Sequence, residues 1–253
     1  MSKIEWTRND DGTEGKTWNP LAGCSIVSPG CTNCYAMRMA ARIERMQPAS
    51  HYKGLTKQVN GNPVWTGKIA RAPEHIFYAP LKWRKPTRVF VNSMSDLFHE
   101  DVRDEWIDRI FAIMALSPRH TFQILTKRLK RMQKYSGRRA ALDNVWLGVS
   151  VENQQAADER IPLLLDTYAA TRFISAEPLL GPLALEALLP GIDWVVVGGE
   201  SGPGKRPVNL DWMRDIRDQC KAAGVPLFVK QIDKVIPIPA DLMIREWPKE
   251  SRD

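Results

Sequence analysis

The sequence predicts an α/β fold, a complete or partial (β/α) barrel with parallel strands. Short apolar, β-branched runs alternate with amphipathic stretches, which is typical of a parallel sheet covered by helices. The 253 residues, 43% of them hydrophobic, also suffice for one such barrel. The apolar runs are 88–93, 121–126, 145–151, 171–175, 194–197 and 226–229.

A seventh strand is expected around Trp18, just before a group of cysteines. Amphipathic helices are expected through 106–114, after the basic pair 127–128, through 157–165 and through 213–220. Roughly seven βα units favour a barrel over an open doubly wound sheet, although the pattern alone leaves both open.

The domain organisation is predicted to be a single barrel domain over residues 1–253, with one insertion. The segment at about 48–85 breaks the strand–helix rhythm because it contains Gly, Pro, Asn and scattered aromatic residues. No apolar run approaches the roughly 20 residues of a membrane helix, and the first residues lack the order of a signal peptide. A soluble, cytoplasmic protein without a membrane partner is therefore expected.

The net charge of +7 and the isoelectric point of about 9.3 indicate a basic surface. Basic residues concentrate at 82–85, 127–131 and 138–139. Such a surface favours DNA or RNA as a partner, and the alternative is a solvated helix face that only keeps the protein soluble. Three tryptophans in expected loops are candidates for stacking on bases: Trp18, Trp65 and Trp83.

Charged or hydroxyl side chains follow nearly every expected strand. Sites in both candidate folds lie at the carboxyl ends of the strands, so these residues predict one shared pocket. The alternative is that loops are simply polar. The residues are Ser93, Asp96, Lys127, Glu152, Glu177, Glu200 and Lys230.

Cys24, Cys31 and Cys34 lie within one short loop, and they predict a metal site in a reducing compartment. Neighbouring glycines and a proline let this loop turn sharply, so that three thiolates converge. Structural zinc needs a fourth ligand, which only His51 or His99 could supply through the fold. A cluster of four irons held by three cysteines instead leaves one iron open for chemistry.

A three-cysteine loop after the first strand, followed directly by the aromatic Tyr35, resembles the radical S-adenosylmethionine enzymes. Their usual spacing is Cys-x3-Cys-x2-Cys, whereas six residues separate Cys24 from Cys31 here. The resemblance is closest to a phage- and prophage-borne family and covers about residues 1–235; spore photoproduct lyase is more weakly similar. The matching strings are at 19–24, 28–36, 94–98, 125–128, 148–152, 175–179 and 198–202.

The resemblance implies a barrel of the radical S-adenosylmethionine type, with a [4Fe-4S] cluster and S-adenosyl-L-methionine as cofactors. Tyr35 would then lie beside the adenine, while Ser93, Lys127, Ser150 and Glu152 would contact the methionine and ribose parts. A reductase or a flavodoxin-type protein would donate the electron. A phage-encoded protein would act in the cytoplasm of a bacterial host cell.

Four further residues have two interpretations each. Glu200 is a candidate for a ribose or substrate hydroxyl, and Glu177 resembles the amino-group-binding Gly-Gly-Glu-Pro motif but follows a later strand. Asp96 is a candidate catalytic residue or a helix cap. Lys230 is a candidate catalytic residue that holds an anionic substrate, or a surface lysine.

Two functions remain open on the sequence. The first is a radical S-adenosylmethionine enzyme that acts on a nucleic-acid base or nucleotide. The alternative is a non-enzymatic protein that binds nucleic acid and uses its cysteines to hold an iron–sulfur cluster or zinc. A pocket lined at every strand end favours the enzyme, because a binding module needs no such pocket. Cys220 is a candidate hydrogen-atom donor to a product radical, although its helical pattern favours a core position.

Overall fold

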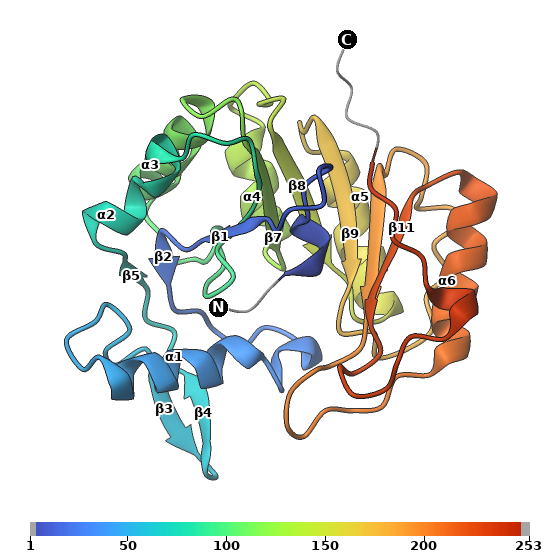
Figure 1. Ribbon diagram of the computed structural model, residues 1–253, viewed down its shortest axis with the longest axis horizontal. Helices are drawn as coiled ribbons and strands as arrows, with labels where there is room; N and C mark the ends of the chain where they lie inside the picture. The colour runs from blue at the N-terminus through green and yellow to red at the C-terminus, as the bar shows by residue number, and fades with distance from the viewer. Residues whose placement is uncertain (1–3, 249–253) are drawn as a thin grey trace.

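The protein is described by a computed structural model for residues 4–248. Its main sheet has seven parallel strands in the order β1-β6-β7-β8-β9-β10-β11. The sheet curls, but β1 and β11 stay at opposite edges, so the architecture is a partial barrel (Figure 1). The strands are β1 (Lys16–Trp18), β6 (Arg88–Val91), β7 (Thr121–Thr126), β8 (Val145–Ser150), β9 (Thr171–Ala176), β10 (Trp194–Gly198) and β11 (Leu227–Gln231).

Helices cover the outer face of the sheet. They are α3 (Asp104–Ala115), α4 (Leu129–Ser136), α5 (Gln154–Leu165) and α6 (Leu210–Ala223). Asn153 and Asn209 cap the starts of α5 and α6 with their side-chain oxygens, and Gly224 ends α6 in the left-handed conformation. Their apolar faces bury the main core against outward-facing strand residues such as Val89 and Ile124.

The inner face of the sheet carries a second, aromatic core. Trp6, in the short helix η1 (Glu5–Thr7), packs against Phe90, Phe173 and Trp194 with ring centroids 5.1, 5.5 and 5.6 Å away. The N-terminal segment therefore fills the hollow of the curved sheet (Figure 1). Gly148 makes room for the ring of Phe173, since a Cβ there would lie 2.4 Å from it.

The segment between β1 and β6 contains short elements and the long helix α1 (Tyr35–Met46). These elements are β2 (Leu21–Ala22), β3 (Thr56–Val59), β4 (Asn62–Trp65), β5 (Ala70–Arg71), α2 (Glu74–Phe77) and η3 (Ala79–Lys82). β3 and β4 form an antiparallel hairpin, and β2 pairs with β5. A small core that includes Met37, Ala40 and Tyr52 holds α1 on this unit.

The predicted parallel sheet is confirmed, and the barrel is partial. Each expected strand is present, and α3, α4, α5 and α6 occupy the stretches expected to be helical. One difference concerns the link from β9 to β10, since residues 177–193 are described and contain no regular helix. The terminal parts of the predicted domain, residues 1–3 and 249–253, lie outside the described residues. Within residues 4–248, no helix has the length and hydropathy needed to span a membrane.

Candidate functional site

The cysteine loop lies at the carboxyl edge of the sheet because it is tied to the loop that follows β6. The Gly23 N–H donates to the Met94 carbonyl at 3.0 Å, and Gly23 pairs with Ser95 in a parallel bridge. Gly23 has a φ of +96°, and a Cβ there would lie 2.0 Å from the Lys68 carbonyl oxygen. Only glycine therefore fits at the residue before Cys24.

The other two cysteines lead into α1. Cys31 ends the short helix η2 (Pro29–Cys31), and Cys34 is the residue before the first turn of α1. A helix N-terminus favours negative charge, so the start of α1 offsets part of the effect of burial on a thiolate at Cys34. Tyr35 begins the helix with 40% of its surface exposed, and its hydroxyl donates to the Ser93 carbonyl at 3.1 Å.

All three thiols of the loop are half-buried. Burial raises the pKa of Cys24 to about 12, and Asp96 adds to this shift while Arg128 opposes it. Burial also raises the pKa of Cys34, and Cys31 adds to the shift. Burial thus disfavours the thiolate forms of Cys24 and Cys34, and a positively charged metal centre would stabilise them.

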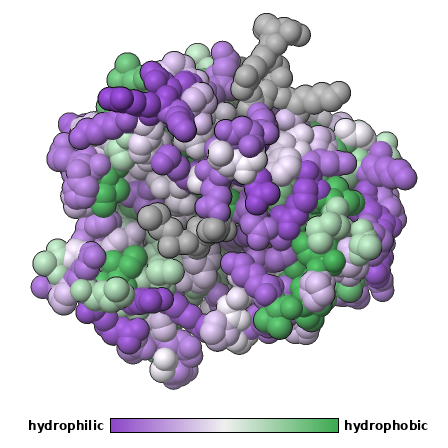
Figure 2. Space-filling view, in the orientation of Figure 1, coloured by the Kyte–Doolittle hydropathy of each residue, from purple (hydrophilic) through white to green (hydrophobic). Residues whose placement is uncertain are grey.

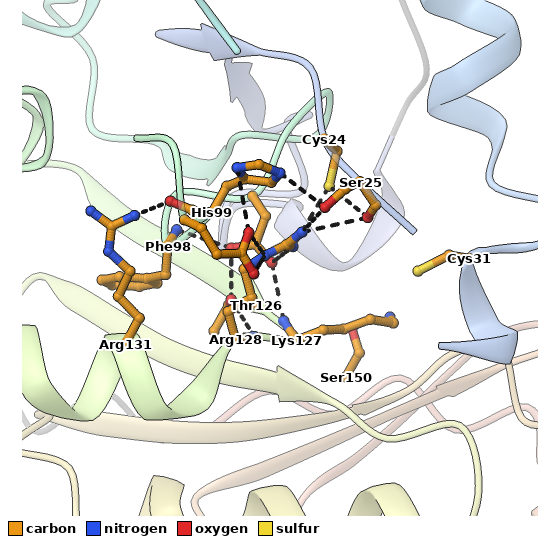
Figure 3. A network of polar contacts seen from close by, with 12 residues as sticks. Cys24, Ser25, Cys31, Phe98, His99, Thr126, Lys127, Arg128, Arg131 and Ser150 are labelled. Atoms are coloured by element: carbon orange, nitrogen blue, oxygen red, sulfur yellow. Dashed lines mark hydrogen bonds and ion pairs between the residues drawn. The ribbon is translucent and has the colours of Figure 1, made fainter. Parts of the chain in front are cut away.

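Arg128 forms the centre of a buried polar network under Cys24 (Figure 3). Its Nη1 donates to the Cys24 sulfur at 3.7 Å and to Asp96 at 3.0 Å. Its Nη2 donates to the Ser25 hydroxyl at 2.7 Å, and its Nε donates to Glu100 at 3.0 Å. Every nitrogen of the guanidinium is thus hydrogen-bonded, which compensates for its burial.

Asp96, a predicted catalytic residue, uses both carboxylate oxygens within this network. Oδ1 accepts from the Thr126 hydroxyl at 2.7 Å and from the Phe98 N–H at 3.0 Å. Oδ2 accepts from the Lys127 N–H at 3.2 Å and from Arg128. Asp96 does not cap α3, which begins at residue 104; it joins the loop after β6 to the end of β7.

Lys127 and Glu152 lie together on the inner side of the mouth. Figure 3 shows the Lys127 side chain running past Ser150 toward the side of the site where Cys31 lies. Lys127 is near enough to act electrostatically on both Glu152 and Cys34. Burial alone raises the pKa of Glu152, but Lys127, Ser28 and Arg160 outweigh it and lower the pKa overall.

Four more predicted residues lie at the carboxyl ends of strands. Lys230, the residue before the last one of β11, donates to Glu177 after β9 at 2.5 Å, so the predicted anion-binding lysine already has a carboxylate partner. Ser93 donates from its hydroxyl to Asn19 at 3.1 Å. Ser150 is buried in β8 beside Ser175 of β9.

Glu200 fastens the loop after β10 to the cysteine loop. Its carboxylate accepts from the Asn33 side chain at 2.8 Å and from the Arg206 N–H at 2.7 Å, and it also pairs with the Arg206 guanidinium. Arg206 in turn donates to the Pro29 carbonyl at 2.9 Å, and Arg38 donates to the Pro203 carbonyl at 2.8 Å. We name these contacts the mouth clasp, formed by Asn33, Arg38, Glu200 and Arg206.

The donor set can be tested against the two kinds of metal site. Across the described part of the chain, no group of three or more His, Cys, Asp or Glu side chains is positioned for a single metal ion. His99, a possible fourth zinc ligand, lies 2.9 Å from the Ser25 hydroxyl through its Nε2. A [4Fe-4S] cluster places each thiolate on a different iron, so three spaced thiols of one loop are compatible with it.

Sequence reasoning missed Arg128, Ser25, Asn33 and Arg206 as parts of the site. In the sequence Arg128 stands out only as one residue of a basic run, and the signal for a site role is its position two residues after the end of β7. The suggested base-stacking role is wrong for Trp18 and Trp65, which are buried at 1% and 7% exposure.

The fold and the site together define an α/β protein with a partial parallel barrel and a three-cysteine loop at its mouth. Residues 1–245 match the family described as Protein of unknown function (DUF5131), and the chain belongs to this family. No curated protein and no solved structure matches the chain.

Proposed function

We propose that the protein is a radical S-adenosylmethionine enzyme in which Cys24, Cys31 and Cys34 hold a [4Fe-4S] cluster. One observation carries the proposal. The three thiols belong to a single loop at the carboxyl mouth of a parallel partial barrel, beside the half-buried Lys127. A reduced cluster would cleave the sulfonium bond of S-adenosylmethionine and supply a 5′-deoxyadenosyl radical.

The residues of the mouth have separate roles in this proposal. Lys127 binds the carboxylate of the methionine part, and Glu152, which is buried and paired with Arg160, acts electrostatically on Lys127. The exposed ring of Tyr35 offers an apolar surface to the adenine. The aromatic cluster around Trp6 packs on the inner face of the sheet and would keep water from the site on that side. Binding, orientation and exclusion of water are the contributions of the protein in such chemistry.

The proposed substrate is a nucleic-acid base or nucleotide. Helix α1 leaves the site with Arg38, Arg42 and Arg45 at intervals that place them on one side of the helix. Figure 2 shows that hydrophilic residues dominate the face turned to the viewer, with only separate hydrophobic patches. The arginines of α1 suit a polyanion, and the resemblance to a phage-borne family supports the same substrate class.

The test is anaerobic reconstitution with iron and sulfide, followed by reduction in the presence of S-adenosylmethionine. We expect a brown protein with absorbance near 400 nm, a feature of [4Fe-4S] centres, that releases 5′-deoxyadenosine and methionine. Cys24→Ala, Cys31→Ala and Cys34→Ala should each abolish this, whereas Cys220→Ala should retain it, because Cys220 lies in the core on α6. A colourless protein with stoichiometric zinc would contradict the proposal and favour the non-enzymatic alternative.

A further inference from the structure

Arg128 contacts Cys24 through a side chain that is almost completely buried. Its side chain is 7% exposed, and the Nη1–Sγ distance of 3.7 Å is within hydrogen-bonding range for sulfur. The same guanidinium also holds Ser25, the residue that follows Cys24, at both the hydroxyl and the carbonyl. One arginine therefore fixes the sulfur and the backbone of this part of the loop.

Two carboxylates fix Arg128 itself. Asp96 is 9% exposed at its side chain and receives Nη1, while Glu100 is 65% exposed and receives Nε through both of its oxygens. The planar fork of arginine can serve all of these directions at once, which a lysine ammonium on its flexible stem cannot do. The guanidinium is thus preorganised, and it separates the Cys24 sulfur from the negative charge of Asp96.

A hydrogen bond and a fixed cation at a ligand sulfur affect the two redox states of an iron–sulfur cluster differently. The reduced state carries one more negative charge, so an N–H donor and a positive charge stabilise it more than the oxidised state. Loss of Arg128 would remove both and would leave Asp96 as an unshielded negative charge near Cys24. Both effects make the reduction potential more negative.

We infer that Arg128 is a positioning residue that holds Cys24 as a cluster ligand. It also keeps the reduction potential of the cluster less negative than this potential would be with the three cysteines alone. This inference rests on the proposed [4Fe-4S] cluster. It assigns Arg128 to the site as a residue that acts on the cluster and contacts neither S-adenosylmethionine nor the substrate. The electron that reduces the cluster comes from a low-potential donor, which dithionite replaces in the test.

The experiment compares Arg128→Gln, Arg128→Lys and the control Arg131→Gln after reconstitution. Arg131 lies on α4, three residues after Arg128, and binds the His99 and Val102 carbonyls after β6 and the Asp104 side chain. It donates to these groups and to no cysteine. The measurements are iron content and the midpoint potential, followed by the electron paramagnetic resonance signal of the reduced cluster during a dithionite titration with mediators.

Arg128→Gln should lower the ratio of reduced to oxidised cluster about tenfold at a fixed potential, equivalent to about 59 mV for one electron. Arg128→Lys should shift the potential less in the same direction, and Arg131→Gln should keep the wild-type potential. If Arg128→Gln retains no iron while Arg131→Gln does, the positioning role is supported. The midpoint potential of Arg128→Lys then tests the effect on the reduction potential.

Three results would overturn the inference, and they can be told apart. A wild-type protein that takes up no cluster contradicts the proposed function and the role of Arg128 together. A wild-type protein that cleaves S-adenosylmethionine, with Arg128→Gln at full iron content and unchanged potential, contradicts the role of Arg128 alone. An equal shift in Arg131→Gln would also contradict it, because general loosening of the loop would then explain the effect.

Discussion

Lys127 and Arg128 show how far adjacent residues of like charge can differ in role. Lys127 follows β7, and its side chain lies on the same face as the inward-pointing side chains of this strand. The Arg128 side chain lies under the cysteine loop and is buried next to carboxylates. From their charge alone, both residues were expected to belong to a basic surface. Their position at a strand end was the better guide, because the carboxyl edge of a parallel sheet is where side chains from several strands meet.

The two carboxylates on Arg128 should contribute very differently to stability. Asp96→Ala leaves a buried guanidinium without its buried partner, and we expect the free energy of unfolding to fall by about 3 kcal/mol. Glu100→Ala removes an exposed partner of the same guanidinium and should cost less than about 1 kcal/mol. Urea denaturation of the apo proteins, followed by circular dichroism, measures both values. Equal losses in the two variants would show that burial does not distinguish the pairs.

At the scale of elements, the strands could be predicted from sequence and the loops could not. The strands of this sheet are buried on both faces, so they read as continuous apolar runs with clear limits. The contacts of the mouth clasp join residues that are far apart in the chain, such as Asn33 and Glu200. No local pattern encodes such a pairing, so the sequence indicated that Glu200 lies at the mouth but not what it binds.

The mouth clasp should make stability depend on pH through Glu200. Burial alone raises the pKa of Glu200, but hydrogen bonds from Arg206 and Asn33 outweigh it and lower the pKa overall. A lowered folded-state pKa stabilises the fold above the unfolded-state pKa, which is about 4.5 for glutamate, and this contribution is lost as the pH falls through the folded value.

We therefore expect Glu200→Gln to lower the free energy of unfolding by about 1.5–3 kcal/mol at pH 7. The difference from wild type should shrink steadily below about pH 4.5. Denaturant titrations between pH 7 and pH 3 measure it. Glu74→Gln is the control, because Glu74 forms an exposed pair with Arg71 and should change stability little at any pH. A Glu200→Gln difference that is constant with pH would contradict the linkage.

At the scale of the whole molecule, composition indicated a basic protein but did not show which basic residues face a binding partner. Much of the basic character is paired within the fold, for example Arg139 with Asp108 and Arg160 with Glu152. The net charge of +7 is therefore a weak guide to a binding surface. Helix α1 is the better candidate, because it starts at the cysteine loop and carries exposed Arg42 and Arg45.

This placement predicts which charges bind a nucleic acid. The double variant Arg42→Gln/Arg45→Gln should weaken binding to a fluorescent single-stranded oligonucleotide and reduce the slope of log K against log salt concentration by about 1.4, or about 0.7 for each lost phosphate contact. The control Lys134→Gln/Arg138→Gln removes the same charge from exposed residues at the far end of α4. It should leave the slope near that of wild type, since α4 covers the outer face of the sheet. Fluorescence anisotropy at several salt concentrations measures both variants, and equal losses would show that net charge, rather than the α1 surface, drives the binding.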